Sequence, residues 1–234
     1  LRAEYKENPF LDEIHPRLRW ELKIAARNQF QKAYQLIVAS SAEKLAKGVG
    51  DMWDSGKVLS ASTSQVVYAG KSLSSGQRVW WKVRVWDADD KVGTWSAAGE
   101  WELGKIKRSD WQAQWIGADL RDLAPKNSEY DLPPSPYFRQ QTHLDKKVQS
   151  ARLYISSLGL HDFYINGKKI GSDYFGSGWT DYNKRVYYQV YDVSKELVLG
   201  ENAFAAVLSE GWYAGYLGYA LLVGSKEVKH FYGD

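Results

Sequence analysis

The sequence predicts an all-β protein with two consecutive antiparallel β-sandwich domains. Three observations support this fold class: short segments in which apolar and polar side chains alternate, turn residues between these segments, and a high aromatic content. The 234 residues contain 11 Trp, 16 Tyr and 7 Phe, and aromatic side chains favour strands, where they bury large areas. A chain of this length is long enough for two ordinary domains, each with its own core.

The first domain is expected at residues 1–105, where brief strands alternate with turns. The clearest strand is 78–87, because apolar side chains recur with a period of two on one of its faces. Strands are predicted at 16–22, 32–40, 52–58, 65–70, 78–87 and 93–104, with a short helical or turn segment at 41–48 that is closed by Gly48. Roughly seven short strands within about 100 residues are typical of an immunoglobulin-like or fibronectin type III sandwich.

The second domain is expected at residues 106–234 and is predicted to be jelly-roll-like. It contains a polar, Pro-rich stretch, 121–137, which predicts a long surface loop. Strands are predicted at 137–144, 150–158, 162–171, 185–193 and 202–213, with one helical turn and a bend at 195–202. Asn166-Gly167 predicts a type I′ hairpin turn, because both central residues of that turn need a positive φ.

Composition and charge exclude several classes of function. The net charge is +3, with both signs mixed along the chain, so no nucleic-acid partner is predicted. No stretch reaches the roughly 18 to 20 consecutive apolar residues of a membrane helix, so no membrane partner is predicted either. The absence of cysteine excludes disulfides and thiolate chemistry. No signal peptide is recognisable; the compartment stays open, with the periplasm or the medium favoured over the cytosol.

Motifs that follow one another along nearly the whole chain carry a family resemblance. In the first half they include "NPFLDEIHPRLRWEL" and "YAGKSLSSGQRVWWKVRVWD", and in the second half "ARLYISSLGLHDFYINGKKIG" and "GWTDYNKRVYYQVYDV". Together they resemble the N-terminal region of the bacterial α-L-rhamnosidases, glycoside hydrolase family seventy-eight. The resemblance implies a fibronectin-III-like domain, then a β-sandwich sometimes classed as a rhamnose-binding module, and then a large catalytic helical barrel.

The same resemblance implies that no catalytic residue lies in this chain. The family hydrolyses terminal rhamnose with inversion, using an acid and a base carboxyl group, and both belong to the barrel. The chain stops at "VKHFYGD", where another strand is predicted to begin, so we expect a fragment that continues beyond residue 234. Two positions depart from the family pattern. Val79-Trp80 replaces two tyrosines, which predicts a lost or replaced tyrosine-corner bond, and Ala214 stands where a basic residue is common.

A first candidate sugar site lies in the segment 176–193. Rings from Trp179 and Tyr182 could stack on a sugar, while Asp181, Asn183 and Arg185 could bind its hydroxyl groups. The alternative, which we favour, is that Trp179 plugs the end of the sandwich and Asp181 caps the following turn. In the adjoining strand, alternation predicts Val186, Tyr188 and Val190 on the core face, opposite an amphipathic face formed by Arg185, Tyr187, Gln189 and Tyr191.

A second candidate is the segment 209–220, in which Trp212, Tyr213 and Tyr216 alternate with glycines. Because glycine has no side chain to cover the neighbouring rings, these rings could line a sugar groove. They could equally form an interface that the catalytic domain buries. We also expect this aromatic surface to make the isolated chain associate.

No metal or independent catalytic centre is predicted. The four histidines, His15, His143, His161 and His230, lack metal-ligand spacing, and no nucleophile elbow or phosphate loop is present. No cofactor is predicted, although Asp173, Asp181 and Asp192 could supply oxygens to calcium. The predicted function is therefore a non-catalytic support for a rhamnosidase that could also bind a rhamnose-containing saccharide. The alternatives are a free-standing carbohydrate-binding or adhesion module and a purely structural module.

Overall fold

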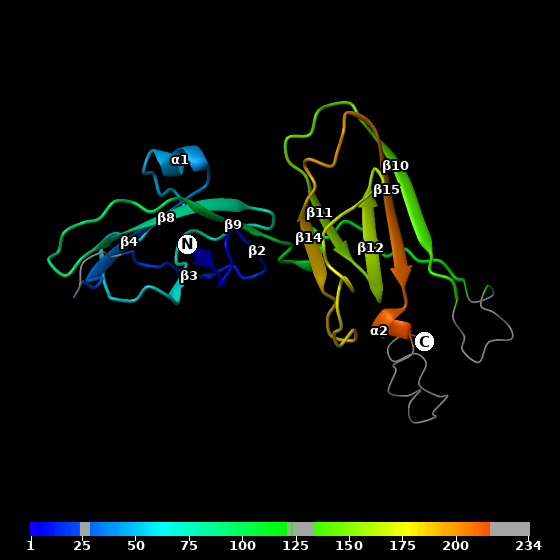
Figure 1. The fold of residues 1–234 in the computed structure, drawn as a ribbon, viewed down its shortest axis with the longest axis horizontal. Coiled ribbons are helices and arrows are strands. Elements are labelled where there is room, and N and C mark those ends of the chain that lie inside the picture. Colours follow the sequence, from blue (N-terminus) through cyan, green and yellow to red (C-terminus); the bar gives the residue numbers. More distant parts are fainter. Residues whose placement is uncertain (24–28, 121–122, 124–132, 216–234) are drawn as a thin grey trace, which may run out of the picture. The chain divides into compact units, whose positions relative to one another are not determined.

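A computed structural model describes residues 1–23, 29–120, 123 and 133–215. The chain divides into two compact units, Leu1–Gln114 and Trp115–Asp234, and each unit has a hydrophobic core of its own. Strands dominate both units (Figure 1), which confirms the predicted all-β fold class. Most of the Pro-rich loop predicted at 121–137 lies outside the described residues.

Unit 1 has two sheets. The first contains, in spatial order, β1 (Arg2–Ala3), β3 (Arg17–Arg19) and β7 (Val66–Val67). The second contains β2 (Phe10–Leu11), β9 (Gly99–Leu103), β8 (Arg78–Trp86), β4 (Ala33–Ala39) and β5 (Trp53–Asp54), and β6 (Val58–Leu59) also pairs with β4. The pairing is antiparallel except between β2 and β9, where Phe10 lies opposite Glu102 in a parallel register. A 3₁₀ turn, η1 (Arg108–Asp110), follows β9.

Aromatic rings fill the core of unit 1. The ring of Tyr68 meets Trp101 edge to face, with 5.5 Å between centroids, and Trp101 meets Trp81 in the same way at 6.4 Å. The Tyr68 hydroxyl donates to the backbone oxygen of Lys71 at 2.7 Å. A buried tyrosine outside the long strand β8 thus makes a hydroxyl-to-backbone bond, which agrees with the second of the two predicted outcomes, a lost or a replaced tyrosine-corner bond.

Strand β4 is buried on both faces, whereas the alternation of Tyr34, Leu36 and Val38 predicts a single core face for 32–40. Leu36 and Val38 face the main core, while Ile37 packs with Leu45 of helix α1 (Ala42–Ala46) in a second cluster. The helix begins at Ser41, whose Oγ accepts from the amide of Lys44 at 3.2 Å. A helical segment was predicted at this place, but not that it would cover the far face of the sheet.

The outer face of β8 combines aromatic rings with cations. Lys82 and Arg84 lie over the ring of Trp95, at 5.1 and 4.7 Å from its centroid. Lys57 lies 4.8 Å over the ring of Trp86. Such contacts stabilise by roughly 0.5 to 1 kcal/mol each where exposed. These cation–π contacts give the tryptophan side chains on the outer face of β8 a stabilising role.

Unit 2 is also a sandwich of two sheets. One contains β10 (Tyr137–Leu144), β15 (Gly200–Ser209), β12 (Leu160–Ile165) and β13 (Lys168–Lys169), and the other pairs β11 (Arg152–Ser156) with β14 (Tyr188–Asp192). Its core centres on Ile165, Ile170 and Val193, with side chains from both sheets around them. A short helix, α2 (Gly211–Ala214), follows β15.

The turn predicted at Asn166-Gly167 is confirmed, because both residues have positive φ, 51° and 81°. The helical turn predicted at 195–202 is a hydrogen-bonded turn, in which the amide of Glu196 donates to Val193 O at 3.1 Å. The core face predicted for 185–193 is wrong. Tyr191 and Val193 pack into the core, because the pairing with β11 places Tyr191 opposite the core residue Leu153.

Candidate functional site

The loop after β13 is held together by its own polar groups. The backbone oxygen of Asp181 accepts from the amides of Lys184 and Arg185, at 2.9 and 3.0 Å. The Asp181 carboxylate accepts from the amide of Asn183 at 3.2 Å and pairs with the ammonium group of Lys184 at 3.1 Å. Asp181 therefore caps a turn, as the favoured alternative in the sequence analysis requires.

Two other predicted sugar ligands also have partners inside the protein. Arg185 donates from Nε to the hydroxyl of the buried Thr180 at 3.2 Å, and its guanidinium lies 5.1 Å over the ring of Tyr187. The Tyr182 hydroxyl donates to Gly178 O at 3.2 Å. These bonds hold the loop in one conformation. A sugar could bind to Arg185 and Tyr182 only through donors and acceptors that these bonds do not occupy.

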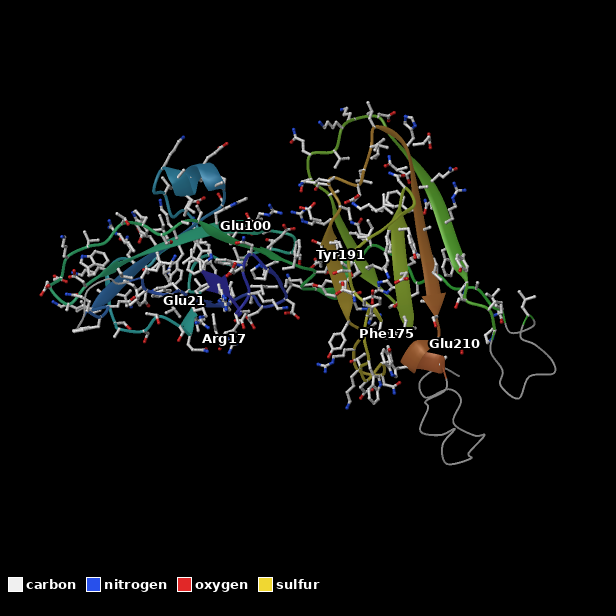
Figure 2. The ribbon with its side chains drawn as sticks, in the orientation of Figure 1. Arg17, Glu21, Glu100, Phe175, Tyr191 and Glu210 are labelled. Carbon is white, nitrogen blue, oxygen red and sulfur yellow. The ribbon has the colours of Figure 1, made fainter. Side chains whose placement is uncertain are left out.

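The two predicted segments meet at one end of unit 2. Trp212 of α2 contacts Phe175 edge to face, with 5.8 Å between ring centroids, and Tyr213 contacts Tyr182 at 5.3 Å. Phe175 and Glu210, which precedes α2, lie at the same end of the sandwich (Figure 2). We call this region, loop 174–185 with α2, the aromatic end. Tyr216 lies outside the described residues.

Several rings of the aromatic end are open to solvent. Tyr174 is 85% exposed, Phe175 65% and Trp179 57%. Trp179 therefore does not plug the sandwich, contrary to the favoured alternative. Phe175 also has a φ of 57°, a left-handed conformation that a bulky side chain rarely adopts. Exposed aromatic clusters of this kind mark surfaces that bind a ligand or another domain.

Beneath this end lies a polar cluster that sequence reasoning missed. His161 shares a hydrogen bond between Nδ1 and the Oγ of the buried Ser157 at 2.8 Å. Tyr191 donates its hydroxyl to Asp173 at 2.6 Å. Burial lowers the pKa of His161 and raises the pKa of Tyr191. A cavity of about 10 Å³ adjoins His161 and Asp173, which is room for no more than about one water molecule.

Sequence could not reveal this cluster because its members come from four separate segments. His161 and Tyr191 sit on strands of different sheets, and Asp173 lies in the loop between them. Only pairing in space brings them together. Ser157 is buried, His161 and Tyr191 are partly buried and Asp173 is exposed. The small cavity beside them offers no room for a substrate.

Comparison with known proteins identifies both units. Residues 1–107 match the family model of the Rha78A-like, N-terminal immunoglobulin domain, and residues 146–234 match that of the alpha-L-rhamnosidase N-terminal domain. The chain thus has, in order, the two domain families found in the N-terminal region of α-L-rhamnosidases. The resemblance predicted from the sequence is thereby confirmed.

Individual relatives and solved structures agree with these family matches. An α-L-rhamnosidase of Formosa agariphila is 37% identical over 87% of this chain and 22% of its own length. The structure of α-L-rhamnosidase from Dictyoglumus thermophilum matches 91% of this chain and 25% of its own, with a TM-score of 0.84 and 39% identity. That of Aspergillus terreus matches all of this chain and 25% of its own, with a TM-score of 0.77 and 26% identity. The chain thus spans about a quarter or less of these rhamnosidases.

Calcium binding to this rhamnosidase N-terminal region stays a prediction. The three aspartates named for it have separate partners: Asp173 holds Tyr191, Asp181 holds Lys184, and Asp192 pairs with Arg152 at 3.0 Å. Within the described residues, no group of three or more His, Asp or Glu side chains is placed to hold a metal ion. No helix in that part of the chain is long and apolar enough to cross a membrane.

Proposed function

We propose that this chain is the non-catalytic N-terminal part of an α-L-rhamnosidase and that it braces a catalytic domain of the same polypeptide. Both of its domains match N-terminal domain families, and the matching rhamnosidases are about four times as long. On this proposal the carboxyl groups that cleave terminal rhamnose lie in the remaining three quarters of the protein.

The observation that carries the bracing role is the aromatic end of unit 2. Its rings are exposed, and the polar groups between them are already bonded within the loop. Phe175 holds a left-handed backbone conformation while its ring faces solvent. Strained backbone of this kind costs about 1 to 3 kcal/mol and is found at functional sites. A surface that retains such a residue is suited to burial against a further domain.

The test uses the full-length protein. Replacing Tyr174 and Trp179 together with serine should make the enzyme lose its activity faster at raised temperature, because the catalytic domain loses part of its support. The half-life of this activity is measured by the hydrolysis of p-nitrophenyl α-L-rhamnoside. The matched control is Phe30→Ser, which removes from unit 1 a ring about as exposed as that of Trp179. An unchanged half-life in the double variant would contradict the bracing role. Hydrolysis by the 234-residue chain alone, abolished by changing one of its own carboxylates, would contradict its non-catalytic assignment.

A second candidate function is contact with the rhamnose-containing saccharide itself. The supporting observation is that Trp179 and Asn183 are both exposed in the same loop, since a ring and an amide can bind the apolar face and a hydroxyl of one sugar. Calorimetric titration with L-rhamnose, with and without calcium, should then show heat of binding for the wild-type chain and none for the Trp179→Ala variant. Absence of heat would favour a purely structural module. A reading frame that ends near residue 234 would favour a free-standing binding or adhesion module.

A further inference from the structure

Unit 1 contains a groove that the bracing role does not use. Its volume is about 610 Å³, within the range of roughly 300 to 1,000 Å³ that is usual for small-molecule sites. It is bordered by the turn after β1, by β2 with the loop that follows it, and by the paired residues Arg17 and Val67 of β3 and β7. Arg17 is labelled in Figure 2.

One wall of the groove is fixed by an ion pair. The Glu4 carboxylate accepts from Nε and Nη2 of Arg17, at 3.1 and 2.5 Å, and from the Arg17 amide at 2.6 Å. The guanidinium also lies 5.2 Å over the ring of Tyr5. Arg17 donates to both carboxylate oxygens, and such paired bonds set direction as well as energy. The guanidinium is therefore held in place before any ligand arrives.

The turn that carries Glu4 has an unusual backbone. Ala3 and Lys6 exchange two backbone hydrogen bonds of 3.0 Å, and the residues between them, Glu4 and Tyr5, have φ values of 44° and 66°. Two positive φ values define a type I′ turn, which normally selects Asn and Gly. Glutamate and tyrosine are strained there. In this turn the Glu4 carboxylate bonds to Arg17 and the Tyr5 ring lies beside the guanidinium.

The groove also presents charged, polar and apolar side chains. In the part of the chain that the structure describes, the Lys6 ammonium and the Asp12 carboxylate have no ion-pair partner and are exposed. His15 donates from Nδ1 to Tyr68 O at 3.2 Å, which leaves Nε2 as an acceptor. The half-buried ring of Phe10 and the exposed side chain of Val67 supply apolar surface. Donors, acceptors and apolar area are thus combined in one groove.

The balance of charges indicates the class of ligand. A polyanion would meet the carboxylates of Glu4, Asp12 and Glu13, and a polycation would meet Lys6 and Arg17. Among the described residues, no set of side chains in the groove could hold a metal ion. A neutral polyhydroxylated molecule can use the donors and acceptors together, and its C–H faces can lie on the apolar side chains. We propose that this groove binds a neutral oligosaccharide.

This proposal concerns unit 1 and holds whether or not the chain braces a catalytic domain. The test is a titration of the isotope-labelled 234-residue chain with rutinose, a disaccharide that ends in L-rhamnose, and with maltose, followed by amide chemical shifts. Residues 4–17 should shift with at least one of the two sugars. Asp12→Ala should then weaken binding about tenfold, as expected for a lost hydrogen bond to a charged group.

Two controls separate the groove from other effects. Asp89→Ala removes an exposed carboxylate of the same unit that does not line the groove, and it should leave the affinity unchanged. Trp179→Ala should likewise leave shifts of residues 4–17 intact, because that ring belongs to unit 2. Shifts confined to residues 174–213 would overturn the groove proposal and support the sugar contact at Trp179. No shift with either disaccharide, or equal losses in Asp12→Ala and Asp89→Ala, would also overturn it.

Discussion

The side chain of Asn166 donates from Nδ2 to Oδ1 of Asn202 at 2.9 Å. This bond ties the turn between β12 and β13 to β15. Asn202 is only 1% exposed, and its amide also donates to the backbone oxygens of Val198 and Gly200, at 2.7 and 3.0 Å. One buried side chain thus satisfies the backbone of the bend that precedes β15, next to an apolar core with few fully buried residues.

Replacing Asn202 with alanine should therefore destabilise unit 2 by about 3 kcal/mol, because it leaves buried donors and acceptors without partners. Urea unfolding followed by tryptophan fluorescence measures the loss. The control is Asn183→Ala in the exposed loop, for which a change within about 0.5 kcal/mol is expected. Equal effects of the two substitutions would show that the Asn202 bonds contribute little.

Tyr68 offers a second test, in the core of unit 1. Tyr68→Phe keeps the ring contacts with Trp53 and Trp101 but removes the bond from the hydroxyl to Lys71 O, and should cost about 1 kcal/mol at neutral pH. Burial raises the pKa of Tyr68 to about 12, above the value of about 10 in an unfolded chain. The folded state therefore keeps its proton longer, and stability should fall as pH rises from about 10 to 12.

The Tyr68→Phe variant lacks this ionisation, so its stability should fall less steeply over the same alkaline range. Thermal melts at pH 9 and pH 11 measure the difference, with Tyr174→Phe as the control because Tyr174 is exposed. Parallel decline in wild type and Tyr68→Phe would assign the alkaline loss to other groups, such as Tyr34, whose pKa is also raised by burial.

The acid side of the pH profile should depend on His161. Burial lowers its pKa, against the opposing effect of the nearby carboxylates Asp162 and Asp173. In the unfolded chain imidazole takes up a proton near pH 6.5, whereas in unit 2 it does so only at lower pH. Unfolding should therefore become easier as pH falls below about 6.5. His161→Gln should flatten the melting temperature between pH 7.5 and 5.5; an unchanged slope would exclude His161 as the cause.

Sequence patterns correctly predicted those turns and strands that are determined by residues within the same short segment. Asn166-Gly167 specified its turn because both residues readily adopt the positive φ values of a type I′ turn, and the alternation in 78–87 specified β8. Alternation failed for 185–193, because tyrosine and valine occur on both faces and the pairing with β11 decides which face is buried. It also failed for β4, since only the three-dimensional position of Leu45 shows that the second face is covered.

Of the candidate sites, one could be predicted from the sequence and the other could not. Aromatic composition indicated the loop around Trp179 and the segment that contains Trp212, and the structure brings them together through Phe175 and Tyr182. The groove on unit 1 had no sequence signal, because its lining comes from short, unremarkable stretches around Lys6, Asp12 and Val67. Their proximity follows from sheet pairing alone.

The aromatic end should also control association of the isolated chain, as predicted from residues 209–220. Phe175→Asn removes an exposed ring at a position where φ is 57°, and asparagine tolerates this conformation better than phenylalanine. The variant should therefore keep its melting temperature, since relief of backbone strain offsets the lost contact with Trp212, while its association weakens. Sedimentation velocity at high protein concentration measures association. A wild-type chain that remains a monodisperse monomer would contradict the prediction, and a large loss of melting temperature in Phe175→Asn would show that the ring stabilises unit 2 itself.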